Sequence, residues 1–188
     1  PMLNVCLWGG LVGGFITAMI IIFKKHLAPV LTPVYAALEG LFLGAISCQF
    51  EMQYGGIVSQ AVLCTFGVLA ALLMAYQSGL IKPTENFKLG VVAATGGIAI
   101  FYIVALLMNM FGGSIDFMTD SSPLSIGISV FVVTIAALNL VLDFDFIEQG
   151  AEAGAPKYME WFGAFGLMVT LIWLYLEILR LLAKLRDR

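Results

Sequence analysis

Six long apolar stretches alternate with short polar segments along the chain. The stretches cover roughly residues 3–23, 33–50, 57–76, 89–111, 124–142 and 158–182. Each comes close to the roughly 20 consecutive apolar residues that a helix needs to cross the hydrocarbon core of a bilayer. The segments between them contain residues that end helices, such as Pro29, Gly55, Pro83 and Pro156. This alternation predicts six transmembrane helices.

The composition leaves no room for a soluble domain. Hydrophobic residues make up 61% of the 188 positions and charged residues 11%, whereas a soluble domain has roughly 45–50% apolar and about 25% charged residues. A chain of this length has too little interior to hide that apolar excess, so the excess faces lipid. No connecting segment is long enough to separate two domains. We therefore expect an all-α membrane protein, a polytopic transmembrane helix bundle with a single transmembrane domain over residues 1–188.

The charge and the reactive side chains exclude several classes of function. The formal net charge is -3 and the chain has no basic stripe, which excludes a nucleic-acid partner. His26 is the only histidine, so Ser-His-Asp catalysis, Cys-His catalysis and multi-histidine metal sites are excluded. The three cysteines lie in apolar stretches without metal-ligand spacing. We therefore expect no metal site and no cofactor.

Lysine residues alternate between the connecting segments. Lys24 and Lys25 follow the first stretch, and Lys82 and Lys88 follow the third, whereas the segments after the second and fourth carry only acidic charges. Because lysine and arginine are enriched in cytoplasmic loops, the lysine-bearing segments are predicted to be cytoplasmic. A complete sixth crossing would place the basic C-terminus outside, against the same rule, so the sequence leaves the side of the C-terminus open.

Small residues recur at a spacing of four, which lets the backbones of membrane helices approach closely. The pairs are Gly9 with Gly13, Gly10 with Gly14, and Gly40 with Gly44.

Carboxyl groups within the apolar stretches are the strongest candidates for function, because an ionisable group at membrane depth is costly unless it is paired or hydrated. Glu39 lies well inside the second stretch, as either a hydrogen-bonded or protonated interior carboxyl or part of an ion path. Asp143 ends the fifth stretch and shares a helix face with Asn139 four residues earlier. Asp145 points elsewhere and is expected to be an interfacial residue in water.

Glu177 is the third such carboxyl, and two interpretations of it are open. Arg180 follows three residues later, so a local ion pair on one helix face is the simpler interpretation. Alternatively, Glu177 faces Asp143, and two facing carboxyl groups can share a proton. A shared proton would hold the two helices together, and its loss would separate them or admit a hard cation such as Ca²⁺.

Several motifs resemble the Bax inhibitor-like family, the transmembrane Bax inhibitor motif proteins. Leu138–Glu148 (LNLVLDFDFIE) and Leu174–Leu182 (LYLEILRLL) look like the last two helices of that family. Tyr35–Gly44 is similar to its third helix and Gly79–Gly90 to the loop between the fourth and fifth. Leu142–Met159 resembles a bacterial branch, which implies an integral protein of the bacterial inner (cytoplasmic) membrane.

The resemblance implies a seven-helix bundle with the last helix near its centre. Six helices are present, and we expect the first to be missing from a chain that begins with Pro1. It also implies a pH-sensitive cation leak, chiefly of Ca²⁺, in which two aspartates from the last two helices sense pH. Asp143 matches the first sensor position, and Glu177 replaces aspartate at the second. The candidate site is therefore Asp143, Glu177 and Glu39, with Asn139, Asp145 and Arg180 in support.

Two other functions are alternatives to the channel. The chain can instead be a non-conducting membrane regulator, related to proteins that modulate a membrane protease or a stress response, with carboxyl groups that are only structural. An aspartyl protease dyad also needs two carboxyl groups that share a proton. Intramembrane aspartyl proteases have Tyr-Asp and Gly-x-Gly-Asp contexts, whereas Leu142 and Leu176 precede the carboxyl groups here. We therefore expect no enzymatic activity, and as partners the lipid bilayer, permeant cations and a membrane protease.

Overall fold

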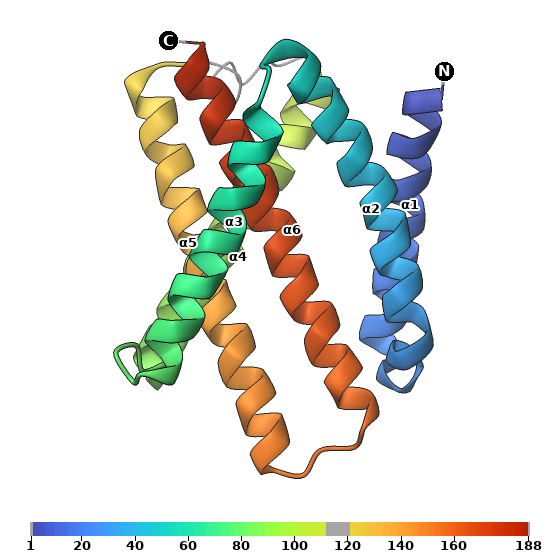
Figure 1. Ribbon diagram of the computed structural model, residues 1–188, viewed down its shortest axis with the longest axis vertical. Helices are drawn as coiled ribbons and strands as arrows, with labels where there is room; N and C mark the ends of the chain where they lie inside the picture. The colour runs from blue at the N-terminus through green and yellow to red at the C-terminus, as the bar shows by residue number, and fades with distance from the viewer. Residues whose placement is uncertain (1, 112–120, 188) are drawn as a thin grey trace. The chain divides into compact units, whose positions relative to one another are not determined.

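The computed structural model describes residues 2–111 and 121–187, and this part of the chain is helical without β-strands. Its six α-helices are each long and apolar enough to cross a membrane, which confirms the predicted fold class. They are α1 (Met2–Phe23), α2 (Ala28–Gln53), α3 (Ile57–Gln77), α4 (Glu85–Met110), α5 (Pro123–Glu152) and α6 (Tyr158–Arg186), with a short 3₁₀-helix, η1 (Lys25–Leu27), before α2 (Figure 1).

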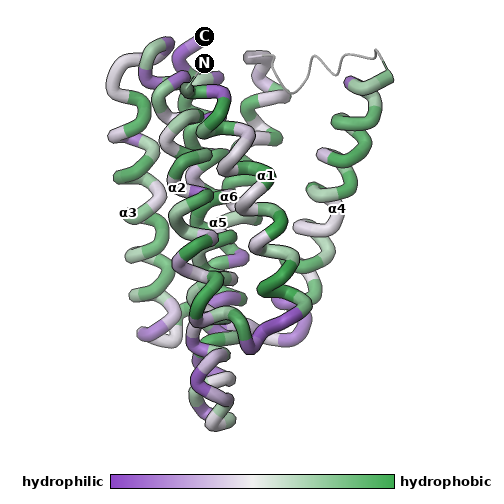
Figure 2. Tube along the Cα trace, turned by 90° about the vertical axis from the view of Figure 1, so that its right-hand side faces the viewer, coloured by the Kyte–Doolittle hydropathy of each residue, from purple (hydrophilic) through white to green (hydrophobic). Residues whose placement is uncertain are grey.

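Hydropathy along each helix follows the pattern expected of membrane spans. Hydrophobic positions fill the middles of the helices, and hydrophilic positions gather at helix ends and in the connecting turns (Figure 2). In a helix every backbone N–H and C=O is satisfied within the segment, so such a segment can lie in lipid without unpaired backbone groups. The chain is therefore an integral membrane protein.

The fifth helix is longer than the sequence suggested. Its expected end at residue 142 is wrong, because α5 continues for almost three more turns to Glu152. Gly150 is accommodated inside the helix, and the first glycine with positive φ after α5 is Gly154 (φ 62°). The Gln149 amide donates a hydrogen bond to Asp145 Oδ2 one turn earlier (2.6 Å). The segment 143–152 is polar but still helical, so Asp143 and Asp145 lie within a helix.

Two other helices begin earlier than expected. α2 begins at Ala28 rather than Pro33, with Pro29 in its first turn and Pro33 inside the helix. Proline in the first turn removes no intrahelical bond, and an interior proline is tolerated in membrane helices where neighbouring groups satisfy the freed carbonyl. α4 begins at Glu85 because the Thr84 hydroxyl caps it, accepting a hydrogen bond from Phe87 N (3.3 Å).

The chain forms two compact units. The first unit comprises Pro1–Val58 and Asp143–Ile172, and the second comprises Ser59–Leu142 and Trp173–Arg188. α5 and α6 each contribute one end to each unit. The single transmembrane domain expected from the sequence stays a prediction.

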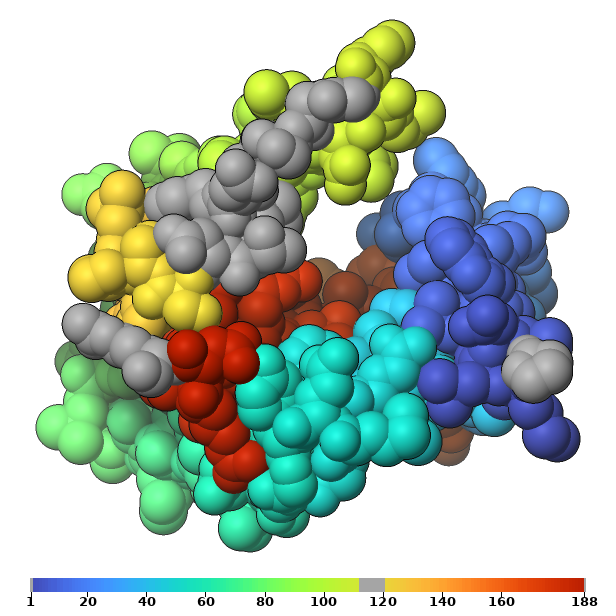
Figure 3. Space-filling model, turned by 90° about the horizontal axis from the view of Figure 1, so that it is seen from above, coloured from blue at the N-terminus to red at the C-terminus, as the bar shows by residue number. Residues whose placement is uncertain are grey.

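In the first unit, α1 lies directly against α2 (Figure 3). A Cβ added to Gly10 would lie 2.6 Å from the carbonyl oxygen of Leu38, and one added to Gly14 would lie 2.5 Å from Glu39 Oε1. These two glycines therefore permit the close approach that the four-residue spacing predicted. Gly13 also faces α2, with an added Cβ 3.2 Å from the Leu38 side chain, whereas an added Cβ would meet nothing within 4 Å at Gly9, Gly40 and Gly44.

The first half of α6 packs on α2 within the same unit. The rings of Tyr35 and Phe165 meet edge to face with centroids 4.9 Å apart, and the Thr32 hydroxyl donates a hydrogen bond to the Trp161 carbonyl oxygen (3.4 Å). These contacts surround the buried Glu39 on α2 with side chains of three helices.

The second unit has its own apolar core between α4, α5 and α6. Ile98, Val132 and Ile135 are buried there, with Trp173 packed against them. Asn139 of α5 donates a hydrogen bond to Thr95 Oγ1 of α4 (2.8 Å) and another to the Ile135 carbonyl oxygen one turn earlier (2.8 Å). Polar and apolar contacts together hold α4 and α5 in register.

Candidate functional site

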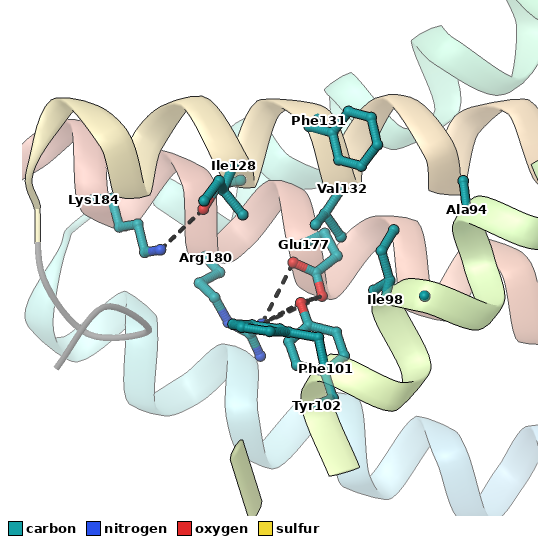
Figure 4. Close-up of a pocket in the computed structure, with 12 residues that line it drawn as sticks. Ala94, Ile98, Phe101, Tyr102, Ile128, Phe131, Val132, Glu177, Arg180 and Lys184 are labelled. Carbon is teal, nitrogen blue, oxygen red and sulfur yellow. Dashed lines mark hydrogen bonds and ion pairs between the residues drawn. The ribbon is translucent and has the colours of Figure 1, made fainter. Parts of the chain in front are cut away.

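Glu177 is buried in the second unit and lies at the centre of a three-residue cluster (Figure 4). The Tyr102 hydroxyl of α4 donates a hydrogen bond to Glu177 Oε1 (2.6 Å). Arg180 Nη1 lies 3.3 Å and 3.4 Å from the two carboxylate oxygens and donates a further hydrogen bond to the Tyr102 oxygen (3.1 Å). The predicted ion pair between Glu177 and Arg180 is therefore confirmed.

The cluster combines three kinds of interaction that suit a charged carboxylate in an apolar bundle. A buried carboxylate is tolerable when a cation and hydrogen-bond donors replace its hydration. The guanidinium group also stacks near the Tyr102 ring, with Arg180 Cζ 5.7 Å from the ring centroid. Glu177 is thus held by charge, hydrogen bond and packing at once.

Lys184 lies one turn beyond Arg180 on the same face of α6. Its side chain is buried, and Nζ donates hydrogen bonds to Ser125 Oγ (2.7 Å) and Ser129 Oγ (2.9 Å) of α5. Lys184 therefore contacts α5 through both serine side chains. Arg188, which continues the same face, lies outside the described residues.

Asp143 lies in the first unit and is held differently. Its side chain has a hydrogen bond with Thr170 of α6, and a Cβ added to Gly166 would lie 3.7 Å from Oδ1. Its second oxygen, Oδ2, is buried and has no hydrogen-bond partner among residues 2–111 and 121–187. Asp143 therefore has one carboxyl oxygen to which no described residue donates a hydrogen bond.

Glu39 also lies in the first unit, against the backbone of α1 at Gly14. Its carboxyl group has a hydrogen bond with the Tyr35 side chain, one turn earlier on α2. Glu39, Tyr35 and Gly166 line a cavity of about 390 Å³ whose walls come from α1, α2 and α6. Gly166 thus borders both this cavity and the Asp143 carboxyl group.

The supporting residues have separate roles. The Asn139 amide nitrogen donates its hydrogen bonds to Thr95 and to the Ile135 carbonyl oxygen, as described above. Neither of these bonds involves Asp143. Asp145 is partly exposed on α5 and accepts a hydrogen bond from Gln149. The interfacial position expected for Asp145 stays a prediction.

The proposed pairing of Asp143 with Glu177 stays a prediction. Asp143 belongs to the first unit and Glu177 to the second, and each has partners within its own unit. The sequence did not single out Tyr102 or Thr170, which supply those partners. A hydroxyl-bearing residue inside a long apolar stretch is the only local signal for either of them, and it does not say which carboxyl group it meets.

The polar groups around Glu39 and Asp143 suit protons and hard cations. They are carboxylate and hydroxyl oxygens, the ligands that Ca²⁺ prefers, whereas the second unit places Arg180 and Lys184 beside Glu177. Among residues 2–111 and 121–187, no group of three or more histidine, cysteine, aspartate or glutamate side chains is arranged to hold a metal ion. The cavity beside Glu39 offers one carboxyl group rather than a closed coordination shell.

The chain matches a known protein family over almost its whole length. A family model described as Bax inhibitor 1 like matches residues 1–187, which confirms the resemblance inferred from the motifs of the last two helices. The assignment to a bacterial branch stays a prediction. No curated protein and no solved structure matches the chain significantly.

Proposed function

The chain belongs to the Bax inhibitor 1 like family, and from this membership and the interior carboxyl groups we propose that it is a pH-sensitive cation leak channel for Ca²⁺. In this proposal Asp143 is the proton-binding group, Glu177 is the second carboxyl of the sensor, and Glu39 lies on the ion path. The protein carries out no enzymatic reaction. Its membrane is the bacterial inner membrane.

The observation that carries the proposal is the unpaired oxygen of Asp143. A charged carboxylate with a buried oxygen that accepts no hydrogen bond is strongly disfavoured, so such a group binds a proton or a cation. Among the described residues, Asp143 Oδ2 has no partner, whereas both oxygens of Glu177 face Arg180. The two carboxyl groups therefore have different tasks, and Asp143 is the one that exchanges its proton.

Thr170 supports this assignment because its hydroxyl has a single hydrogen. Thr170 Oγ1 lies 3.2 Å from the Gly166 carbonyl oxygen and also has a hydrogen bond with Asp143. While the hydroxyl donates to Gly166, a protonated Asp143 can donate to Thr170. Once Asp143 is ionised, the hydroxyl turns to donate to the carboxylate, and the Gly166 carbonyl loses that donor. The proton on Asp143 thus sets the local bonding of α6.

Glu39 and its cavity provide the route in this proposal. Gly166 lines the cavity and also lies beside the Asp143 carboxyl group, so an ionised Asp143 attracts a cation that has reached Glu39. The ionised state is also the one in which the Thr170 hydroxyl no longer donates to the Gly166 carbonyl oxygen. Cation flux is therefore expected to rise with pH as Asp143 loses its proton.

The test is Ca²⁺ flux into liposomes that contain the purified protein and a Ca²⁺ dye, measured from acidic to mildly alkaline pH. Wild-type flux is expected to rise with pH, whereas Asp143→Asn is expected to show low flux without pH dependence, because the amide cannot ionise. Asp145→Asn is the matched control, since Asp145 lies two residues along the same helix and is partly exposed. This control is expected to retain the wild-type pH profile.

Two outcomes would contradict the proposal. An unchanged pH profile in both Asp143→Asn and Glu177→Gln would remove the sensor assignment. The absence of Ca²⁺ flux in the wild type at every pH would remove the channel itself. The second outcome would favour the non-conducting regulator, which binds a membrane protease or stress-response partner through its surface, and crosslinking in native membranes would then identify that partner.

A further inference from the structure

A second cavity, of about 440 Å³, lies within the second unit between α4, α5 and α6. Its walls are mostly apolar, with Ile98, Val132 and the exposed rings of Phe101 and Phe131 among them. A volume of a few hundred Å³ with apolar walls and a few polar groups is typical of a site for a small organic ligand. The exposed rings at its edge belong to helices whose outer surfaces are apolar, so the cavity opens towards lipid.

The polar groups of this cavity are confined to one end (Figure 4). Lys184 lies in the last turn of α6, and Arg180 lies about 9 Å before the end of that helix. At the other end, Ala94 lies about four turns before the end of α4. Because helix ends lie near the membrane surface, the cavity is polar towards the surface and apolar towards the middle of the bilayer.

Among the described residues that line the polar end, two side chains are positive and one is negative. Arg180 and Lys184 line it together with one carboxylate, Glu177. Arg180 uses only Nη1 for its bonds to described residues, so Nε and Nη2 remain as donors. The Arg180 side chain is 39% exposed, and a ligand in the cavity can therefore reach those donors.

From this arrangement we propose that the cavity binds a single-chain amphiphile with a carboxylate head, that is, a long-chain fatty acid. The carboxylate accepts hydrogen bonds from the free donors of Arg180, as guanidinium groups favour, and the acyl chain lies along Phe101, Ile98 and Ala94. A phospholipid fits less well, because its phosphate would have to carry a glycerol and a second chain about 9 Å below the end of α6. The cavity shares Glu177 with the proposed sensor, but fatty-acid binding is measured without Ca²⁺ flux and does not require the channel activity.

Quenching of the fluorescence of Trp173 tests whether the acyl chain lies in the cavity. Trp173 packs against the same apolar core that lines the cavity. In a Trp8→Phe/Trp161→Phe background, Trp173 is the remaining tryptophan of the three. A stearic acid brominated along its chain is expected to quench this fluorescence saturably in nanodiscs, because bromine quenches at short range. The brominated methyl ester, which lacks the negative charge, is expected to quench at least about tenfold less effectively.

Two variants locate the ligand within the cavity. Gly97 lines the cavity, and a Cβ added there would meet nothing within 4 Å, so Gly97→Leu is expected to extend its side chain into the apolar end. Gly96→Leu is the matched control, since Gly96 has the same open space but does not line the cavity. Saturable quenching is expected to disappear in Gly97→Leu and to remain in Gly96→Leu.

The polar end is tested with both charges removed together. Arg180→Gln/Glu177→Gln removes both members of the ion pair, so neither is left without its partner as in a single substitution, and is expected to raise the apparent Kd at least about tenfold. Non-saturable quenching by the brominated acid, equal quenching by its ester, or equal losses in Gly96→Leu and Gly97→Leu would each overturn the proposal. Stronger, Arg180-dependent quenching by a brominated anionic phospholipid would also overturn it, in favour of a bilayer lipid.

Discussion

At the scale of single residues, the protein treats its interior carboxyl groups unequally. The Glu177 carboxylate contacts the Tyr102 hydroxyl and the Arg180 guanidinium group, which itself lies over the Tyr102 ring. Its charge is therefore compensated by these neighbours. Asp143 has one hydroxyl partner and one buried oxygen without a partner among the described residues. The cost of a buried charge depends on its partners rather than on depth alone, so these two groups are expected to respond differently to the same substitution.

Tyr102→Phe tests how much the phenol contributes. The change removes the hydroxyl that donates to Glu177 and accepts from Arg180 while it keeps the ring. The free energy of unfolding is expected to fall by about 1–2 kcal/mol, since hydrogen bonds between membrane helices contribute about this much. The measurement is unfolding of the purified protein by increasing SDS in mixed micelles.

Tyr158→Phe serves as the control for that substitution. Tyr158 begins α6 and is partly buried, and its hydroxyl makes no hydrogen bond with a described residue. Its loss is expected to change the unfolding free energy by less than about 0.5 kcal/mol. Equal effects of the two substitutions would show that the Tyr102 hydroxyl contributes nothing to the Glu177 cluster.

At the scale of the helices, backbone proximity decides which residues are required. α1 and α2 approach so closely at Gly10 that a methyl group there would collide with backbone atoms of α2. Backbone cannot move aside as a flexible side chain does. At Gly9, the residue before Gly10, an added Cβ would meet nothing within 4 Å. Two neighbouring glycines in one helix therefore have different tolerance for a side chain.

Gly10→Ala and Gly9→Ala compare these two positions directly. Alanine at Gly10 is expected to destabilise the protein by about 1–3 kcal/mol, the usual cost of overpacking. Alanine at Gly9 is expected to be neutral or to stabilise by up to about 1 kcal/mol, because alanine favours the helix. Thermal unfolding of both variants in the same detergent checks this order, and a Gly10→Ala variant as stable as Gly9→Ala would contradict it.

At the scale of the whole molecule, α6 decides the topology. The sequence left open whether the last apolar stretch crosses the bilayer completely. α6 is one continuous helix of 29 residues, about 43 Å long, which exceeds the roughly 30 Å hydrocarbon core. The buried positions of Glu177 and Lys184 also remove two charges from its lipid-facing surface. Both features favour a complete crossing.

Single cysteines placed in a Cys6→Ala/Cys48→Ala/Cys64→Ala background test this topology. Ser78→Cys in the turn after α3 is expected to react with a membrane-impermeant maleimide from the cytoplasmic side, as the lysine distribution predicts. Gln53→Cys and Asp187→Cys are both expected to react from the opposite side. Labelling of Asp187→Cys together with Ser78→Cys would show that α6 does not cross.

Local physics explains how much of this protein the sequence determines by itself. Hydropathy is a property of each segment, so all six membrane helices and the fold class were predicted correctly from it. The ion pair of Glu177 with Arg180 was also predictable, because residues three apart meet on any helix. The start of α4 was predicted too late, because a capping threonine extends that helix. The end of α5 was predicted too early, because a polar but unbroken segment continues it.

Only the tertiary structure decided which faces of these helices meet. A helix that is apolar on every side carries no pattern that distinguishes a lipid-facing position from a buried one. The sequence therefore could not tell Gly10 from Gly9, or assign Tyr102 to Glu177 and Thr170 to Asp143. Those partners come from different helices, and packing alone brings them together. The apolar sequence by itself determines that the chain lies in lipid and where its helices form, whereas the partners of each buried carboxyl group depend on how the helices pack.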